Sequence, residues 1–249
     1  MKKVILLGLF VLVLLSCDSE KAPDCLKTAG KTITEERLTE SFSSILVNEG
    51  LRLVVRQQER YKVTVETGEN LIADVDAKVV AGQLILSMNN TCNWVRDYGE
   101  TIIYVDAPEL TEIRSSTQFD VRSEGILRFE SLTLLSENFQ MPDYRTDGEF
   151  YLDVDVDRLS VTFNSLANAY ISGQCEQLNL NFASGNSRFE GRDLEAASVN
   201  IYHRGSNDII VNPINSLIGD LFGTGNVIVV SRPEVVEVQE HYRGRLIYE

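Results

Sequence analysis

Hydrophobic and polar residues alternate with a period of two along most of the chain. Three segments between residues 45 and 66 follow this pattern, and two further pairs of segments flank Gly82 and Pro108. This period is typical of strands with one buried face, and Gly and Pro between such segments are typical of turns. Residues 70–78, "NLIADVDAK", could form one helical turn, but no longer helical period is found. The pattern therefore predicts an all-β protein.

The second half of the chain repeats a unit of strand, polar corner and strand. Four segments carry it: "SVTFNSLANAYISG", "LNLNFASGNSRFEG", "SVNIYHRGSNDIIV" and "LIGDLFGTGNVIVV". Each corner contains an asparagine, and these are Asn168, Asn186, Asn207 and Asn226. A period of about twenty residues with two short strands per unit favours a parallel β-solenoid.

The physical reason for the corners is conformational. Asn and Gly adopt the left-handed conformation that a tight corner needs, and stacked amides can bond to the next coil. In such a fold the apolar residues of all units share one core, and we expect these to be Leu180, Phe182, Phe189, Val199, Ile201, Ile209 and Val211. The alternative is an antiparallel β-sandwich, which predicts antiparallel neighbours and no stacked asparagines.

Several motifs resemble a known family. They are an opening "FSSILVNEGLRLVVRQQERYKVTVETGENL", a Gly–x–Leu hairpin in "VVAGQLIL" and a Pro–x–Leu–x–x–Ile step in "IYVDAPELTEIRSS". With the later corners, they make residues 40–249 similar to the head GIN domain of auto-transporter adhesins, which is common in Bacteroidetes lipoproteins. The resemblance implies a right-handed parallel β-helix with a β-rich N-terminal part. The corner sequences differ from the Ser-Gly motif of the family, so the resemblance does not fix the register of the coils.

The first sixteen residues have the pattern of an export signal. Lys2 and Lys3 precede an apolar run that ends in "LLSC" at Cys17. The run is short for a membrane span, and the serine before Cys17 resembles the lipobox of bacterial lipoproteins, in which the cysteine is acylated. We therefore expect a signal peptide at residues 1–16, a tether at 17–40 and one folded domain at 41–249. An ordinary secreted protein with a free Cys17 is the alternative.

The charge narrows the choice of partners. The formal net charge is -14 and the pI is about 4.6, and such an acidic surface disfavours binding to nucleic acid. Asp18 and Glu20, close behind Cys17, resemble the acidic export signal of surface lipoproteins in Bacteroidetes. We expect a protein of the cell envelope, held in the outer membrane by its lipid, with a surface glycan or an envelope protein as its partner.

The remaining cysteines predict a disulfide. Cys25 lies in the tether and Cys92 in a polar loop, so these two can pair more easily than a loop cysteine with one inside a strand. Cys175 would then be a free, packed thiol. The two histidines, His203 and His241, are far from any Cys-x-x-Cys pair, so neither a metal nor another cofactor is expected.

Two groups of polar residues could carry chemistry. Asp153, Asp155 and Asp157 alternate along one strand and could attract a cation, but a solvated strand face is the simpler interpretation. A second group could serve a glycan-cleaving enzyme or form ion pairs between coils: Arg188, Glu190, Arg192, Asp193, His203, Arg204 and Asp208.

Aromatic residues could also bind a sugar by stacking. Trp94, Tyr98, Tyr104 and Tyr144 are the candidates, although Trp94 could instead cover the end of the coil stack. The leading hypothesis is a lipid-anchored, non-enzymatic β-helix that serves adhesion or a structural interaction. The alternative is an envelope protein that binds or cleaves glycans.

Overall fold

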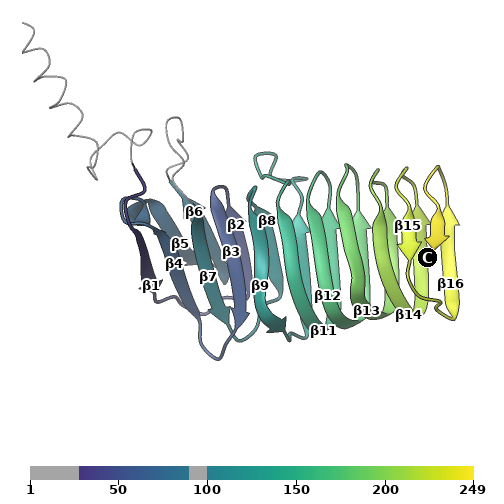
Figure 1. Ribbon diagram of the computed structural model, residues 1–249, viewed down its shortest axis with the longest axis horizontal. Helices are drawn as coiled ribbons and strands as arrows, with labels where there is room; N and C mark the ends of the chain where they lie inside the picture. Colours follow the sequence, from purple (N-terminus) through teal and green to yellow (C-terminus); the bar gives the residue numbers. More distant parts are fainter. Residues whose placement is uncertain (1–27, 90–99) are drawn as a thin grey trace, which may run out of the picture.

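The computed structural model describes residues 28–89 and 100–249. Within these ranges the chain forms seventeen strands in one continuous sheet and one short 3-10 helix, η2 (Ile72–Asp74). The strands lie side by side in a row along the longest axis (Figure 1). The predicted all-β class is confirmed, and η2 falls where one helical turn was expected.

The first nine strands are short. They are β1 (Thr32–Arg37), β2 (Ser44–Asn48), β3 (Leu51–Gln57), β4 (Lys62–Gly68), β5 (Val75–Val80), β6 (Gln83–Met88), β7 (Thr101–Ala107), β8 (Glu112–Ser116) and β9 (Asp120–Leu127). Antiparallel pairing is found here, in β1–β4, β4–β7 and β5–β6. The β5–β6 hairpin turns at Gly82, as the sequence predicted. β1 lies inside the segment expected to be a tether, so part of that segment joins the sheet.

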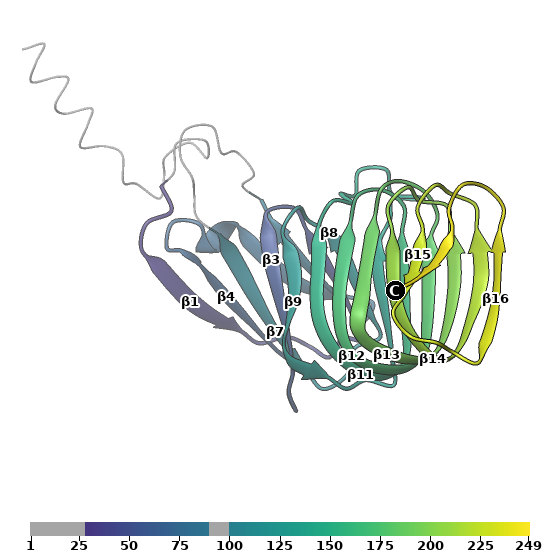
Figure 2. The same ribbon diagram turned by 45° about the vertical axis from the view of Figure 1, so that its right-hand side comes forward.

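The later strands include the longest ones and pair in parallel. They are β10 (Ser131–Ser136), β11 (Glu149–Phe163), β12 (Asn168–Phe182), β13 (Arg188–His203), β14 (Ile209–Leu221), β15 (Val227–Val229), β16 (Val235–Glu240) and β17 (Leu246–Tyr248). The pairs β11–β12, β12–β13 and β13–β14 are all parallel. Figure 2 shows these strands side by side along the body.

Two parallel ladders run through the sheet and merge in the long strands. One passes through β6, β2, β8 and β10 to the second half of β11. The other passes through β7, β3 and β9 to the first half of β11. Beyond β11 each strand continues both ladders, until β15 and β16 pair separately with the two halves of β14.

The inward residues of these ladders form one core. All seven residues expected there are buried: Leu180, Phe182, Phe189, Val199, Ile201, Ile209 and Val211. Phe163 and Phe182 stand opposite each other with ring centroids 5.3 Å apart, and His203 continues the row with a centroid 6.1 Å from that of Phe182. Since parallel register places each residue opposite its counterpart, burial in one unit requires burial in the next.

The bend of β12 depends on a glycine. Gly173 has φ of 107°, which side chains rarely tolerate, and a Cβ added there would lie 2.0 Å from the carbonyl oxygen of Val154 on β11. β12 can therefore adopt this conformation, beside its register shift with β13, only with glycine at this position.

We predict that Gly173→Ala lowers the free energy of unfolding by about 2–3 kcal/mol, because it adds both backbone strain and a clash with β11. Urea denaturation followed by circular dichroism measures this loss. The neighbouring substitution Ser172→Ala is the control and should cost less than about 0.5 kcal/mol. Equal stability of the two variants would contradict the role given to Gly173.

Candidate functional site

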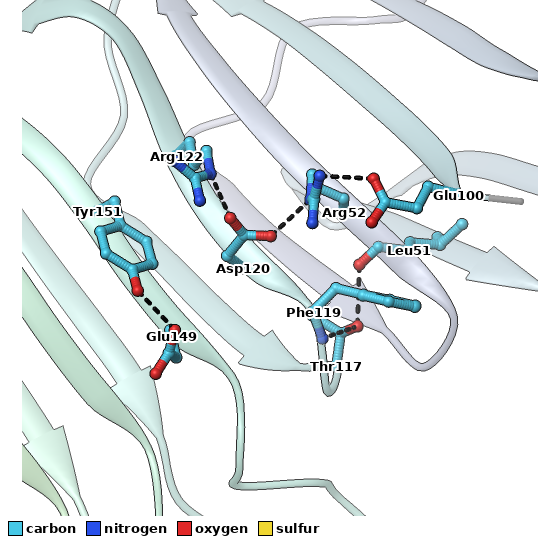
Figure 3. A network of polar contacts seen from close by, with 9 residues as sticks. All are labelled: Leu51, Arg52, Glu100, Thr117, Phe119, Asp120, Arg122, Glu149 and Tyr151. Carbon is cyan, nitrogen blue, oxygen red and sulfur yellow. Dashed lines mark hydrogen bonds and ion pairs between the residues drawn. The ribbon is translucent and has the colours of Figure 1, made fainter.

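A network of charged residues lies where β3, β9 and β11 meet (Figure 3). The carboxylate of Asp120, whose side chain is 8% exposed, accepts a bond from Arg52 Nε at 2.5 Å and is also paired with Arg122. Arg52 reaches onward to Glu100 at 2.5 Å. A buried carboxylate needs such partners because an unpaired charge is costly to remove from water. The ion pair between Arg52 and Asp120 therefore holds β3 and β9 together.

A row of aromatic side chains continues from this network. Tyr151 on β11 and Tyr170 on β12 stand opposite each other, and their rings stack with centroids 4.8 Å apart and 6° between planes. The guanidinium of Arg122 lies 4.6 Å from the centroid of the Tyr151 ring. The hydroxyl of Tyr151 donates to Glu149 at 2.6 Å, and this bond raises the pKa of Tyr151 to about 12. The phenol therefore stays protonated at neutral pH.

Arg122, Tyr151 and Tyr170 line an open groove of about 430 Å³ on β9, β11, β12 and β13. Its polar lining includes Arg122, Asp153, Ser172, Glu190 and Arg192. The mixture of carboxylates, guanidinium groups and hydroxyls suits a polar ligand better than an apolar one.

Irregular pairing lies beside the groove. The register shifts in β9–β11 between Tyr151 and Asp153, in β12–β13 between Tyr170 and Gly173, and in β13–β14 after Glu190. Bulges of this kind bend a strand and redirect side chains, and they occur often beside binding sites. Three such shifts, in the pairs β9–β11, β12–β13 and β13–β14, therefore lie beside the groove, while β11 and β12 pair regularly between them.

The structure separates the second predicted cluster into two parts. Glu190 and Arg192 line the groove, where Glu190 pairs with Arg188 at 2.8 Å and Arg192 pairs with Glu249. His203 instead points into the core, where it is fully buried. The seven residues therefore do not form one constellation.

His203 has a structural role in the core. Its Nε2 lies 3.0 Å from the carbonyl oxygen of Asn207, and its Nδ1 accepts from the backbone N–H of Gly205 at 3.3 Å. These contacts fix the tautomer with the proton on Nε2. Burial lowers the pKa of His203 below its ordinary value of 6.5. The residue is thus a neutral residue of the corner between β13 and β14.

The three aspartates that alternate along β11 form the first predicted cluster. Asp155 accepts from Gln174 at 2.8 Å and pairs with Arg128 at 3.4 Å. In residues 28–89 and 100–249 no group of three or more acidic, histidine or cysteine side chains is arranged to hold a metal ion. Asp153 and Asp155 are partly exposed and Asp157 is exposed, so the three side chains lie on the outer face of β11.

The corner asparagines bond between neighbouring units. Asn168 donates to Glu149 at 3.3 Å and accepts from the backbone of Arg188 at 3.1 Å. Asn226 makes the equivalent pair of bonds, to Asp208 at 3.1 Å and from Arg245 at 3.1 Å. Asn207 donates to the backbone of Asn186 at 3.3 Å.

These asparagines do not share one register position. Arg188, not Asn186, stands opposite Asn168, because Asn186 and Asn207 lie in the connections ahead of β13 and β14. Their amides still link one unit to the next.

Several predicted residues lie outside the described ranges. These are Cys17, Cys25, Cys92, Trp94 and Tyr98. Cys175 is a free, buried thiol, and burial raises its pKa to about 12. Of the other aromatic candidates, Tyr104 lies under Arg56 and Tyr144 under Arg114, at 5.1 Å and 5.9 Å from ring centroid to guanidinium. Sequence reasoning missed Tyr151 and Tyr170, although both alternate with buried neighbours on strands that the repeat aligns.

The fold and these contacts define a class of all-β protein with parallel strands, and comparison with known proteins gives the family. The chain belongs to the family described as "Putative auto-transporter adhesin, head GIN domain", which matches residues 41–233. This confirms the resemblance seen in the sequence. No curated protein matches the chain. Among the described residues, no helix has the length and apolar character needed to cross a membrane.

Solved structures share this fold. A "putative adhesin" from Bacteroides fragilis NCTC 9343 superposes with a TM-score of 0.77 at 19% identity, covering 88% of this chain and 97% of that chain. A "putative adhesin" from Parabacteroides merdae ATCC 43184 gives 0.57 at 15% identity, with 89% and 98% covered. A "Putative lipid binding protein" from Parabacteroides distasonis ATCC 8503 gives 0.59 at 16% identity, with 88% and 97% covered. At these identities the likeness shows a common fold.

We predict that Arg52→Met lowers the free energy of unfolding by about 1–3 kcal/mol, because it removes one of the two partners of a buried carboxylate. Asp120→Asn in the same chain should recover part of that loss, since the amide carries no charge. A double-mutant cycle by urea denaturation measures the coupling between the two positions. Strictly additive effects would show that the Arg52–Asp120 pair is unimportant.

We also predict that His203 makes the fold sensitive to acid. Since its folded pKa lies below 6.5, the unfolded chain binds a proton more readily, so this contribution to stability is complete above pH 6.5 and is lost as the pH falls. In His203→Phe the contribution is absent, so the stability difference from wild type should shrink between pH 7.5 and pH 5. The exposed neighbour variant Tyr202→Ser should follow the wild-type pH dependence. A constant difference for His203→Phe would disprove the assignment.

Proposed function

We propose that this protein is a lipid-anchored adhesion module of the cell envelope, built as a right-handed parallel β-helix without catalytic activity. Membership of the family described as "Putative auto-transporter adhesin, head GIN domain" is the observation that carries the proposal. The remaining support comes from the strand pairing, from the N-terminal sequence, and from the pKa values and ion pairs of the carboxyl groups.

The strand pairing supports the β-helix. Each long strand pairs in parallel with the next strand of the chain, and every such pair needs a connection that crosses back to the start of the ladder. Crossover connections between parallel strands of one sheet are right-handed in nearly all proteins, because the strand twist favours that hand. Adjacent pairs between sequence neighbours then wind into successive turns of one helix.

The N-terminal sequence supports the anchor. Acyl chains on Cys17 would each contribute roughly 0.8 kcal/mol per buried CH₂, so several chains on one cysteine hold a protein firmly on a bilayer. The β1 strand begins fifteen residues beyond Cys17, at Thr32, and starts the sheet at one end of the row of strands (Figure 1). A chain tethered there would stand with the later strands directed away from the membrane.

The carboxylates support a non-catalytic role. A general acid in a glycosidase needs a raised pKa, which burial or a neighbouring carboxylate supplies. Within the described residues, the pKa values of Asp76, Glu137 and Glu249 are lowered from their ordinary values, and hydrogen bonds contribute to each shift. In the groove, Glu190 is paired with Arg188. This environment suits the binding of a ligand more than its cleavage.

We predict that Cys17→Ser abolishes labelling of the protein by a palmitate analogue in growing cells. It should also lower, by about tenfold or more, the binding to mucin-coated wells of cells that express the full chain, because the module would no longer be held on the cell. Cys175→Ser is the matched control and should retain both properties. Retained labelling of Cys17→Ser would disprove the anchor, and equal binding of cells with and without the protein would disprove the adhesive function.

A further inference from the structure

A second outer surface of the long strands is polar and uncharged. It consists of Ser160, Thr162, Asn179, Asn181, Asn200 and Tyr202, which we call the amide face. Ser160, Asn179 and Asn200 stand opposite one another in one row across β11, β12 and β13, and Thr162, Asn181 and Tyr202 form the row beside it. Their chain neighbours Val161, Leu180 and Ile201 are buried, so the amide face lies on the outer side of the sheet.

The amides of this face have no partner among the described residues. No hydrogen bond joins the side chain of Asn179, Asn181 or Asn200 to any other residue within 28–89 and 100–249. The corner amides differ, since those of Asn168 and Asn226 are bonded to neighbouring carboxylates. Each free amide offers two donor hydrogens and an accepting oxygen to a ligand.

The absence of charge on the amide face contrasts with the rest of the protein. The formal net charge is -14, and the groove described above is lined by guanidinium and carboxylate groups. The two rows carry only hydroxyls, amides and one phenol before they reach Ile218 and Asp220 on β14. A neutral ligand rich in hydroxyl groups complements this surface, whereas an anionic ligand would meet the field of the acidic protein.

An exposed aromatic ring borders the amides. Tyr202 is 40% exposed, and its one ring contact within the described part of the chain is with Phe222, at 5.4 Å between centroids and 48° between planes. One side of the ring is thus free of other rings and of cations. In the groove, by contrast, the rings of Tyr151 and Tyr170 already stack on each other, and Arg122 already contacts the Tyr151 ring. A free aromatic face packs well against the C–H groups of a sugar ring.

We propose that the amide face binds a neutral polysaccharide, and this assignment rests on the proposed function because it names the ligand of the adhesion module. Neighbouring strands place equivalent side chains about 4.8 Å apart, and alternate residues of one strand lie about 6.6 Å apart. The side chains of the amide face therefore form a regularly spaced array. A repeating chain of hydroxyl-bearing sugar rings can bond to several members of that array at once, while the ring of Tyr202 receives one sugar by stacking.

Binding of labelled polysaccharides to the full chain, purified in detergent and held on beads, tests the assignment. The neutral probes are fluorescein-labelled mannan, laminarin and dextran, and the acidic probe is polygalacturonate. We expect saturable binding of at least one neutral probe and none of the acidic one. The double variant Asn181→Ala/Asn200→Ala and the single variant Tyr202→Ala should each weaken binding about tenfold, corresponding to the loss of two amides or of one stacking contact.

Two further variants distinguish binding at the amide face from binding elsewhere on the protein. Asn181→Asp/Asn200→Asp keeps the side-chain volume, so it should preserve the fold, as circular dichroism can verify, and still lose binding. Tyr242→Ala removes an exposed tyrosine that belongs neither to the amide face nor to the groove, and it should bind as the wild type does. The proposal is overturned by failure of all neutral probes, by preference for the acidic probe, or by unchanged binding in the amide-face variants. If wild-type cells adhere while these variants adhere equally well, the adhesive function stands and the amide face is not its ligand site.

Discussion

Parallel register couples every unit of this protein to the next. Phe163, Phe182 and His203 stand in one inward row, so the side chain of each forms part of the packing surface for its neighbours. A slip of one residue in any ladder would turn an aromatic core residue to solvent and bring a polar residue such as Asn181 inside. The glycine at position 173 reflects the close approach of β11 and β12, because a Cβ there would lie 2.0 Å from the carbonyl oxygen of Val154.

The same constraint leaves the outer surface free to carry recognition. Outward positions contribute little to the core, so their side chains can differ from unit to unit. Two different surfaces result. The groove beside Tyr151 and Tyr170 arises where pairing is irregular and charges gather, while the amide face arises where pairing is regular and charges are absent. One fold thereby offers two chemically distinct contact areas on the same long strands.

The period-two pattern was sufficient to predict the all-β class and the inward residues from Leu180 to Val211, because burial imposes that pattern directly, and the twenty-residue repeat predicted the parallel pairing. The alignment of asparagines was less informative. Asn168 stands opposite Arg188, since Asn168 begins β12 whereas Asn186 and Asn207 lie in the connections ahead of β13 and β14. The Asp120 network was beyond the reach of sequence reasoning, as its pairing with Arg52 joins residues from distant strands. The groove lies beside register shifts between strands, and the sequence of a single strand does not give its pairing with the next one.

The orientation of the strands has a mechanical consequence. The strands run across the long axis of the body, so the hydrogen bonds between them point along that axis (Figure 1). If the two ends of the row of strands were pulled apart, every pair of neighbouring strands would carry the same force. Each pair would then separate by peeling rather than by shear. The weakest link would then be a short terminal pair such as β1–β4 or β15–β17, while the long β11–β14 block, with its shared aromatic row, would stay intact.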